Sequence, residues 1–190
     1  MTFDFAAARQ NMVDSQVRTS DVTDLAIQDA MLAVARESLC PPGKAALAYA
    51  DVEVPYGAGL FLMRPREVAK LLQALRPRPG ERALAIAAPY AALALEAMGL
   101  TVDRLEGETL GAPAPETYDV VICEGAVSDM PETWLASLRS GGRLAAVVRN
   151  GPVGKASLYA HGEAGLGARE IFDATPPMLP GFERKPQFAF

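Results

Sequence analysis

The run ALAIAA at residues 83–88 is short and wholly apolar, as is typical of a strand in a parallel sheet that is covered on both faces. Three further strands are predicted at 101–105, at 118–123 (YDVVIC, rich in β-branched residues) and at 143–148. Between them, residues 90–98 and 131–138 have the composition of helices. Strands that alternate with helices predict βαβ units. The sequence therefore predicts an α/β fold with a mostly parallel sheet and helices on both faces.

The chain before this region reads as helical. Residues 4–18 contain no Gly or Pro, and a second helix is predicted from a cap at Ser20 or Asp21 to just before Cys40. Residues of this second helix recur at the spacing of one buried face: Ile27, Ala30, Met31 and Val34. A loop is expected over 49–59, and a third helix is expected to begin near Pro65.

The C-terminal tail is expected to be extended at 168–173 and at 184–190, which predicts an antiparallel hairpin at the sheet edge. A chain of 190 residues fits one domain. We therefore expect a single domain, 1–190, with a helical N-terminal cap over 1–76 and the α/β core over 77–190.

Composition excludes several classes of function. The formal net charge is −5 and the basic residues are scattered singly, so we expect no nucleic-acid partner. No stretch reaches the ~18–20 apolar residues of a membrane span and no signal-peptide pattern is present, so we expect a cytoplasmic protein without a membrane partner. Cys40, Cys123 and the single His161 share no metal-like or catalytic spacing. We expect no metal, reduced cysteines, and a surface-loop position for His161.

A ligand of an open α/β sheet binds beyond the carboxyl ends of the strands. Glu106 directly follows the predicted strand 101–105, where a carboxylate can accept hydrogen bonds from the two ribose hydroxyls of a nucleoside cofactor. Asp103 and Glu108 are nearby substitutes. The alternative is that Glu106 is a solvated loop acid.

The turn after the first predicted strand lacks glycine. Cofactor-binding folds place Gly there because the backbone must approach the ligand closely and adopt positive φ. Here the residues are Ala87, Ala88, Pro89 and Tyr90, and Pro89 also removes an N–H donor. This pattern predicts a turn that joins strand to helix with nothing bound. The alternative is a remodelled pocket in which Ala87, Ala88 and Tyr90 still contact a cofactor.

Several segments together resemble the protein-L-isoaspartate O-methyltransferases. They are MVDSQV at 12–17, DAMLAVARESL at 29–39, AYAD at 48–51, PYGAG at 55–59 and PREVA at 65–69. Their order and spacing hold over about residues 9–75, whereas the later matches at 77–84, 102–106 and 118–144 are generic to Rossmann-like methyltransferases. The resemblance implies a Rossmann-like methyltransferase sandwich. It also implies transfer of a methyl group from S-adenosylmethionine to the α-carboxyl of an isoaspartyl residue.

The chain departs from this family in two places. The family's Gln-Thr-Ile-Ser stretch is replaced by Leu60, Phe61, Leu62 and Met63, and its Gly-x-Gly-x-Gly turn is replaced by the shorter run 87–90. These departures predict a silent member with doubtful S-adenosylmethionine binding, kept as a binding or regulatory module for a protein or peptide partner. One alternative is an active O-methyltransferase that acts on isoaspartyl residues of damaged proteins with a divergent cofactor loop. Another is binding of a smaller apolar ligand in a cavity lined by residues 60–63.

Overall fold

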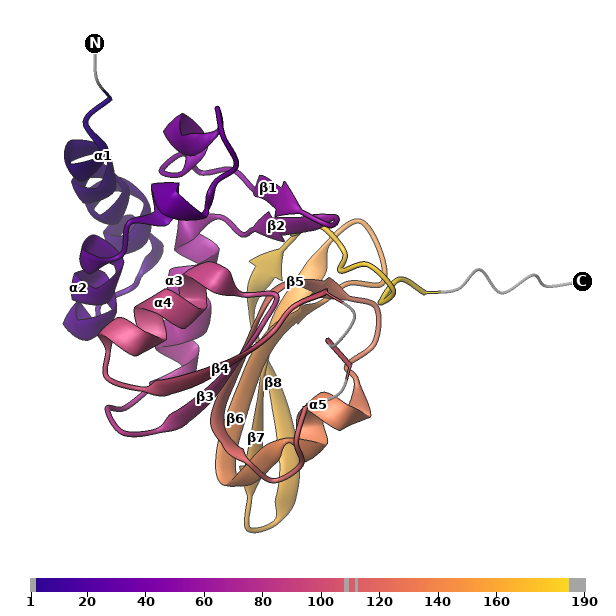
Figure 1. Cartoon of the computed structure of the whole chain (residues 1–190). Helices are drawn as coiled ribbons and strands as arrows, with labels where there is room; N and C mark the ends of the chain where they lie inside the picture. Colours follow the sequence, from indigo (N-terminus) through magenta and orange to yellow (C-terminus); the bar gives the residue numbers. More distant parts are fainter. Residues whose placement is uncertain (1–2, 108–109, 112, 185–190) are drawn as a thin grey trace, which may run out of the picture.

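The centre of the molecule is a six-stranded sheet in the order β4-β3-β5-β6-β7-β8 (Figure 1). The computed structural model describes residues 3–107, 110–111 and 113–184. The strands are β3 (Arg82–Ile86), β4 (Thr101–Leu105), β5 (Tyr118–Val127), β6 (Leu138–Val148), β7 (Gly154–Gly162) and β8 (Gly165–Ala174). The first four run parallel, and β7 and β8 are antiparallel to their neighbours. The predicted α/β fold with a mostly parallel sheet is confirmed.

Helices lie on both faces of this sheet, as expected (Figure 1). Side chains that alternate along β3 and β5 enter two separate apolar clusters. One cluster holds the buried faces of α2 (Leu25–Ala33), α3 (Pro65–Leu75) and α4 (Pro89–Ala97). The other surrounds Trp134 of the short helix α5 (Glu132–Ala136). Every residue of β5 is buried, which explains the apolar run in its sequence.

The N-terminal cap is more broken than the sequence predicts. Helix α1 (Phe5–Met12) continues through a π turn (Val13–Val17) into a 3-10 turn (Arg18–Ser20). The predicted cap of α2 is wrong: Asp21 has a left-handed φ of 62°, and Asp24 instead accepts a hydrogen bond from the Ala26 amide at 2.9 Å. Helix α2 also ends at Ala33, and 3-10 turns follow at Arg36–Leu39 and Ala45–Leu47. The predicted buried face of α2 and the start of α3 at Pro65 are confirmed.

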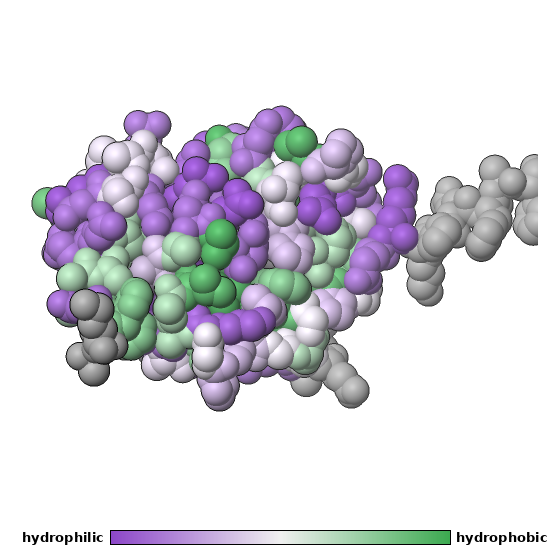
Figure 2. All heavy atoms as spheres, turned by 90° about the horizontal axis from the view of Figure 1, so that it is seen from above, coloured by the Kyte–Doolittle hydropathy of each residue, from purple (hydrophilic) through white to green (hydrophobic). Residues whose placement is uncertain are grey.

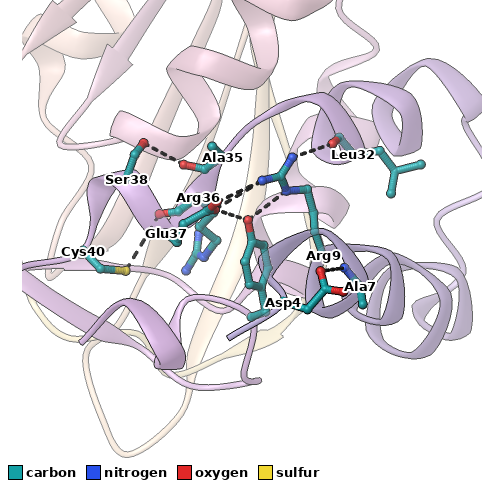
Figure 3. A network of polar contacts seen from close by, with 10 residues as sticks. Asp4, Ala7, Arg9, Leu32, Ala35, Arg36, Glu37, Ser38 and Cys40 are labelled. Atoms are coloured by element: carbon teal, nitrogen blue, oxygen red, sulfur yellow. Dashed lines mark hydrogen bonds and ion pairs between the residues drawn. The ribbon is translucent and has the colours of Figure 1, made fainter. Parts of the chain in front are cut away.

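One guanidinium joins the separate parts of the cap (Figure 3). Arg9 of α1 donates to the Leu32 carbonyl at 3.1 Å and to the Glu37 carboxylate at 3.1 Å. Its Nε donates to the Tyr49 hydroxyl at 2.8 Å, and that hydroxyl donates in turn to Glu37. These contacts hold together α1, the end of α2, the 3-10 turn at 36–39 and the following loop.

The expected loop at 49–59 contains part of a small antiparallel hairpin. Strand β1 (Val54–Gly57) pairs with β2 (Leu60–Leu62) through a turn at Ala58 and Gly59. Both turn residues have left-handed φ angles, 49° and 74°. A Cβ on Gly59 would come within 3.0 Å of Pro180, so glycine also allows the tail to lie against this turn.

The edge hairpin exists, and the predicted strand at 168–173 is confirmed as part of β8, but the strand that β8 pairs with is β7. The hairpin joins β7 to β8 through the tight turn between Gly162 and Gly165. The predicted second strand falls almost wholly on 185–190, outside the described residues. The prediction of a surface loop for His161 is wrong, because His161 lies in β7, where it pairs with Leu166 of β8 and is half-buried. The predicted helix at 131–138 is also shorter than expected, because β6 already begins at Leu138.

Within the described ranges, no helix has both the length and the hydropathy needed to cross a bilayer.

The packing of α3 gives a test of stability. Leu72 is fully buried between α3 and the sheet, whereas Leu166 at the tip of the edge hairpin is 47% exposed. We expect Leu72→Ala to lower the free energy of unfolding by about 2–5 kcal/mol, because a buried cavity is created. The matched change Leu166→Ala should alter it by less than about 0.5 kcal/mol. Urea unfolding followed by circular dichroism measures both; equal losses would contradict the described packing.

Candidate functional site

Strands β3 and β4 end on the same rung of the sheet, and the longer strand β5 passes through it. Ile86 at the end of β3 pairs with Leu105 of β4 on one side and with Cys123 of β5 on the other. The residues immediately beyond this rung are Ala87, Glu106 and Glu124. The carboxyl ends of neighbouring parallel strands are where open α/β sheets bind ligands. This edge is therefore the candidate site.

The turn that follows β3 is closed tightly onto the sheet. Ala87 has a left-handed φ of 47°, a conformation that costs a non-glycine residue roughly 1–2 kcal/mol. Ala87, Ala88 and Tyr90 are all buried. The Tyr56 hydroxyl of β1 donates to the Ala87 carbonyl at 3.3 Å, so the cap hairpin covers the turn. This turn keeps the backbone geometry that favours glycine while carrying side chains that fill the adjacent space.

A buried carboxylate occupies the N-terminus of α4. Glu124 is 1% exposed, and its two oxygens accept hydrogen bonds from the Ala91 amide at 2.8 Å and the Met63 amide at 3.1 Å. No side chain of the preceding residue, Ala88, caps the helix. The first amides of a helix are unpaired and carry partial positive charge, so they attract an anion. Glu124 is that anion here.

Arg36 supplies the opposite charge close to Glu124. Its side chain is fully buried, its guanidinium lies 4.5 Å from the centre of the Tyr90 ring, and it donates to the carbonyls of Ala48 and Met63. Burial raises the pKa of the Glu124 carboxyl. Arg36 and the backbone amides of Met63, Tyr90 and Ala91 act in the opposite direction. The cap, the turn after β3 and the end of β5 thus share one buried polar centre.

The predicted residues at 60–63 differ in how closely they contact this buried polar centre. Met63 is a true part of it: its amide binds Glu124, its carbonyl binds Arg36, and its sulfur accepts from the Gly125 amide at 3.1 Å. Leu62 is buried in the same apolar cluster as Met63 and Tyr90. Leu60 belongs to the other cluster, and Phe61 is half-buried.

The predicted acids differ in position. Glu106 is exposed at the end of β4. Burial raises the pKa of the Tyr56 hydroxyl, and the charges of Glu124 and Glu106 raise it further. The side chains of Glu106 and Glu124 therefore lie near Tyr56. Asp103 is not a substitute for Glu106, because it pairs with Arg82 at 2.8 Å and accepts from the Tyr118 hydroxyl at 3.0 Å. Glu108 lies outside the described residues.

A small cavity lies beyond the strand ends among the residues that the structure describes. This cavity of about 240 Å³ is lined by Ala58, Leu60, Gly107, Leu110 and Pro180. Leu179 packs so closely on Gly125 that a Cβ there would lie 2.6 Å from its Cδ2. Seen from above, this face is covered with side chains, and hydrophobic residues gather near its centre (Figure 2). Among the residues described, no group of three or more His, Cys, Asp or Glu is placed to hold a metal ion.

Sequence reasoning did not identify Arg36 and Glu124 as members of the site. Glu124 does leave a signal, because it is an acid that directly follows the apolar run of β5. Such a residue must be buried with partners or mark the end of the strand. Arg36 leaves none by itself, since an arginine in a helical stretch is usually a solvated residue.

Relatives of known name identify the family. No family model matches the chain. It is 34% identical to a protein-L-isoaspartate O-methyltransferase of Methylorubrum populi, over 80% of this chain and 84% of the relative. The chain belongs to the protein-L-isoaspartate O-methyltransferase family. A relative of the same name from Methylorubrum extorquens is 33% identical over 94% of this chain and 91% of its own length.

Solved structures agree on the fold. A protein-L-isoaspartate O-methyltransferase superposes with a TM-score of 0.73 and 18% identity, over 91% of this chain and 66% of that one. A Plasmodium falciparum structure described as a member of this family, in complex with S-adenosyl-L-homocysteine, gives 0.71 and 14% over 94% of this chain and 99% of that one. The Rossmann-like methyltransferase fold expected from the sequence is confirmed.

The partners of Glu124 predict a large cost for its removal. We expect Glu124→Ala to destabilise the protein by about 3–5 kcal/mol, because buried amides and the Arg36 guanidinium lose their acceptor and counter-charge. Glu124→Gln should cost less, since one oxygen still accepts. The matched control is Glu96→Ala in α4, because the pair of Glu96 with Arg104 is partly exposed; this change should cost at most about 1 kcal/mol. Denaturant unfolding measures all three, and a Glu124→Ala loss no larger than that of Glu96→Ala would refute the arrangement.

Proposed function

We propose that this chain is a catalytically silent member of the family, which does not bind S-adenosylmethionine and serves as a binding or regulatory module for a protein or peptide partner. The observation that carries this proposal is the Glu124 carboxylate on the N-terminal amides of α4. A cytoplasmic location, expected from the sequence, belongs to the same proposal.

The residues present do not fit the carboxylate of S-adenosylmethionine. In α/β folds the turn after the first strand and the following helix N-terminus receive the anionic part of the ligand. Here Pro89 provides no N–H, and the Ala91 amide already bonds to Glu124. A ligand carboxylate would therefore meet a buried acid instead of free donors. Two buried carboxylates at one site repel each other unless one is protonated.

The space does not fit the rest of the cofactor either. The cavity of about 240 Å³ is smaller than the roughly 300–1,000 Å³ of ordinary ligand pockets. Its lining side chains are apolar, so ribose hydroxyls placed there would lose hydrogen bonds at about 1–3 kcal/mol per group. The side chains of Ala87, Ala88 and Tyr56 occupy the approach to the turn.

The substrate side supports the same proposal. The stretch at 60–63 has no hydroxyl, and its backbone and the Met63 sulfur are bonded to Arg36, Glu124 and Gly125. A peptide carboxylate needs donors that position it in line with the methyl donor. The described residues of this stretch offer apolar side chains instead.

A second candidate is an active O-methyltransferase for isoaspartyl residues of damaged proteins. It is supported by the 34% identity to a relative of that name, and by Glu106, which lies at the end of β4 where a ribose would be bound. Opening of the turn at 87–90 and release of Glu124 would be required before a cofactor could enter.

Calorimetric titration with S-adenosylmethionine separates the two candidates. For the silent member we expect no binding tighter than roughly 100 μM, a value typical of enzyme substrate constants. Incubation of the same preparation with labelled cofactor and an isoaspartyl peptide should give no methyl ester. The Methylorubrum populi relative, assayed in parallel, is the control for both measurements. Tight binding together with ester formation would establish the active enzyme.

A further inference from the structure

A broad groove lies at the end of the sheet opposite the candidate site. It consists of two adjoining hollows of about 740 and 510 Å³. Both are lined by Arg76 and Arg78, which follow α3, and by Arg169 of β8. The smaller hollow also includes Glu81 and Asp119 at the starts of β3 and β5. The groove is thus formed by the amino ends of the strands, the end of α3 and the edge strand.

The two acids of the smaller hollow are already paired with other arginines. Glu81 pairs with Arg143 at 2.8 Å, and Asp119 pairs with Arg139. In the part of the chain that the structure describes, Arg76, Arg78 and Arg169 have no carboxylate within ion-pair distance. All three are exposed. A positive groove therefore exists on a chain whose formal net charge is −5.

The wall that carries two of these arginines is held in place. Arg143 donates to the carbonyls of Leu75 and Arg76 at 2.5 and 2.6 Å, which satisfies the C-terminus of α3. Arg76 itself adopts a left-handed φ of 48°. Lys70 adds a further positive charge at the groove, with its ammonium 4.3 Å from the centre of the Phe172 ring. A fixed backbone lowers the entropy lost when these cations bind an anion.

We propose that this groove binds an acidic, extended peptide segment of a partner protein. Carboxylates of such a segment would pair with Arg76, Arg78 and Arg169, because guanidinium and carboxylate groups match in geometry and charge. Among the described residues β8 pairs only with β7, so its outer edge offers backbone N–H and C=O groups. An extended peptide can hydrogen-bond along such an edge.

The groove favours a peptide over a nucleic acid. Its larger hollow is also lined by Asp21 and Asp24, which would repel a backbone that carries a negative charge every ~1.7 Å along a duplex. Aromatic side chains, on which single-stranded bases stack, do not occur among the described residues that line it. A peptide can place its acids at the arginines and neutral residues beside Asp21 and Asp24.

Fluorescence anisotropy with a fluorescein-labelled peptide of alternating glutamate and alanine tests this site in the full-length protein. We expect saturable binding at low salt that weakens as salt is added, because the contacts are exposed charge pairs. Arg78→Ser/Arg169→Ser should reduce the affinity by about tenfold or more. The control Arg18→Ser/Arg104→Ser lowers the net charge equally, at exposed sites outside the groove, and should bind as the unchanged protein does.

Three results would overturn the proposal. One is absence of peptide binding at low salt by the folded protein, and another is equal loss in both double variants. The third is stronger binding of a single-stranded oligonucleotide of the same length, which would assign the groove to nucleic acid. Circular dichroism of each variant checks that it is folded. The titration with S-adenosylmethionine tests the site at the carboxyl ends of the strands, whereas the peptide titration tests the groove at their amino ends. Failure of one proposal is therefore distinguishable from failure of the other.

Discussion

A carboxylate removed from water needs hydrogen-bond donors and an opposite charge, and in this protein the groups that supply them to Glu124 come from three different parts of the chain. The Met63 amide belongs to the segment after β2, the Ala91 amide belongs to the first turn of α4, and Arg36 belongs to the cap. Because an uncompensated buried charge is costly, these segments are bound to one geometry. The closed turn at Ala87 and the position of the cap over the strand ends both depend on it.

Under the proposed function, this constraint accounts for a family scaffold that is stable with no ligand at the strand ends. In a binding-competent α/β fold, free amides at a helix N-terminus are satisfied by the ligand. Here an internal side chain satisfies them, so the fold no longer needs a ligand to complete its hydrogen bonds. Arg9 and Arg36 hold the cap together through hydrogen bonds, and Arg36 also packs on the Tyr90 ring of the core.

Much of the fold follows from local sequence. The strands β3 and β5 show in the sequence as apolar runs, and the start of α3 shows as Pro65. The buried face of α2 shows as apolar residues at helical spacing. The errors lie where a long-range contact overrides local preference. His161 belongs to a strand because the turn at 162–165 returns the chain onto β7, and the cap of α2 moves to Asp24 because Asp21 is used to turn the chain.

The site could be predicted only in part for the same reason. Ala87, Ala88 and Met63 stand at positions that the family pattern marks, so their change was visible in the sequence. Glu124 and Arg36 are 88 positions apart, the difference between their residue numbers, and nothing local indicates that they share one buried centre. The proximity of these two charges becomes visible only when the cap is placed over the strand ends.

The central claim is that Glu124 permanently holds the α4 amides, and amide NMR tests it most directly. In ¹⁵N-labelled protein, addition of S-adenosyl-L-homocysteine should leave the resonances of Met63, Tyr90, Ala91 and Gly125 unmoved, with slow hydrogen exchange at Ala91 because its donor is buried and bonded. Saturable shifts at these amides would contradict the account, since they would show that a ligand displaces the Glu124 carboxylate.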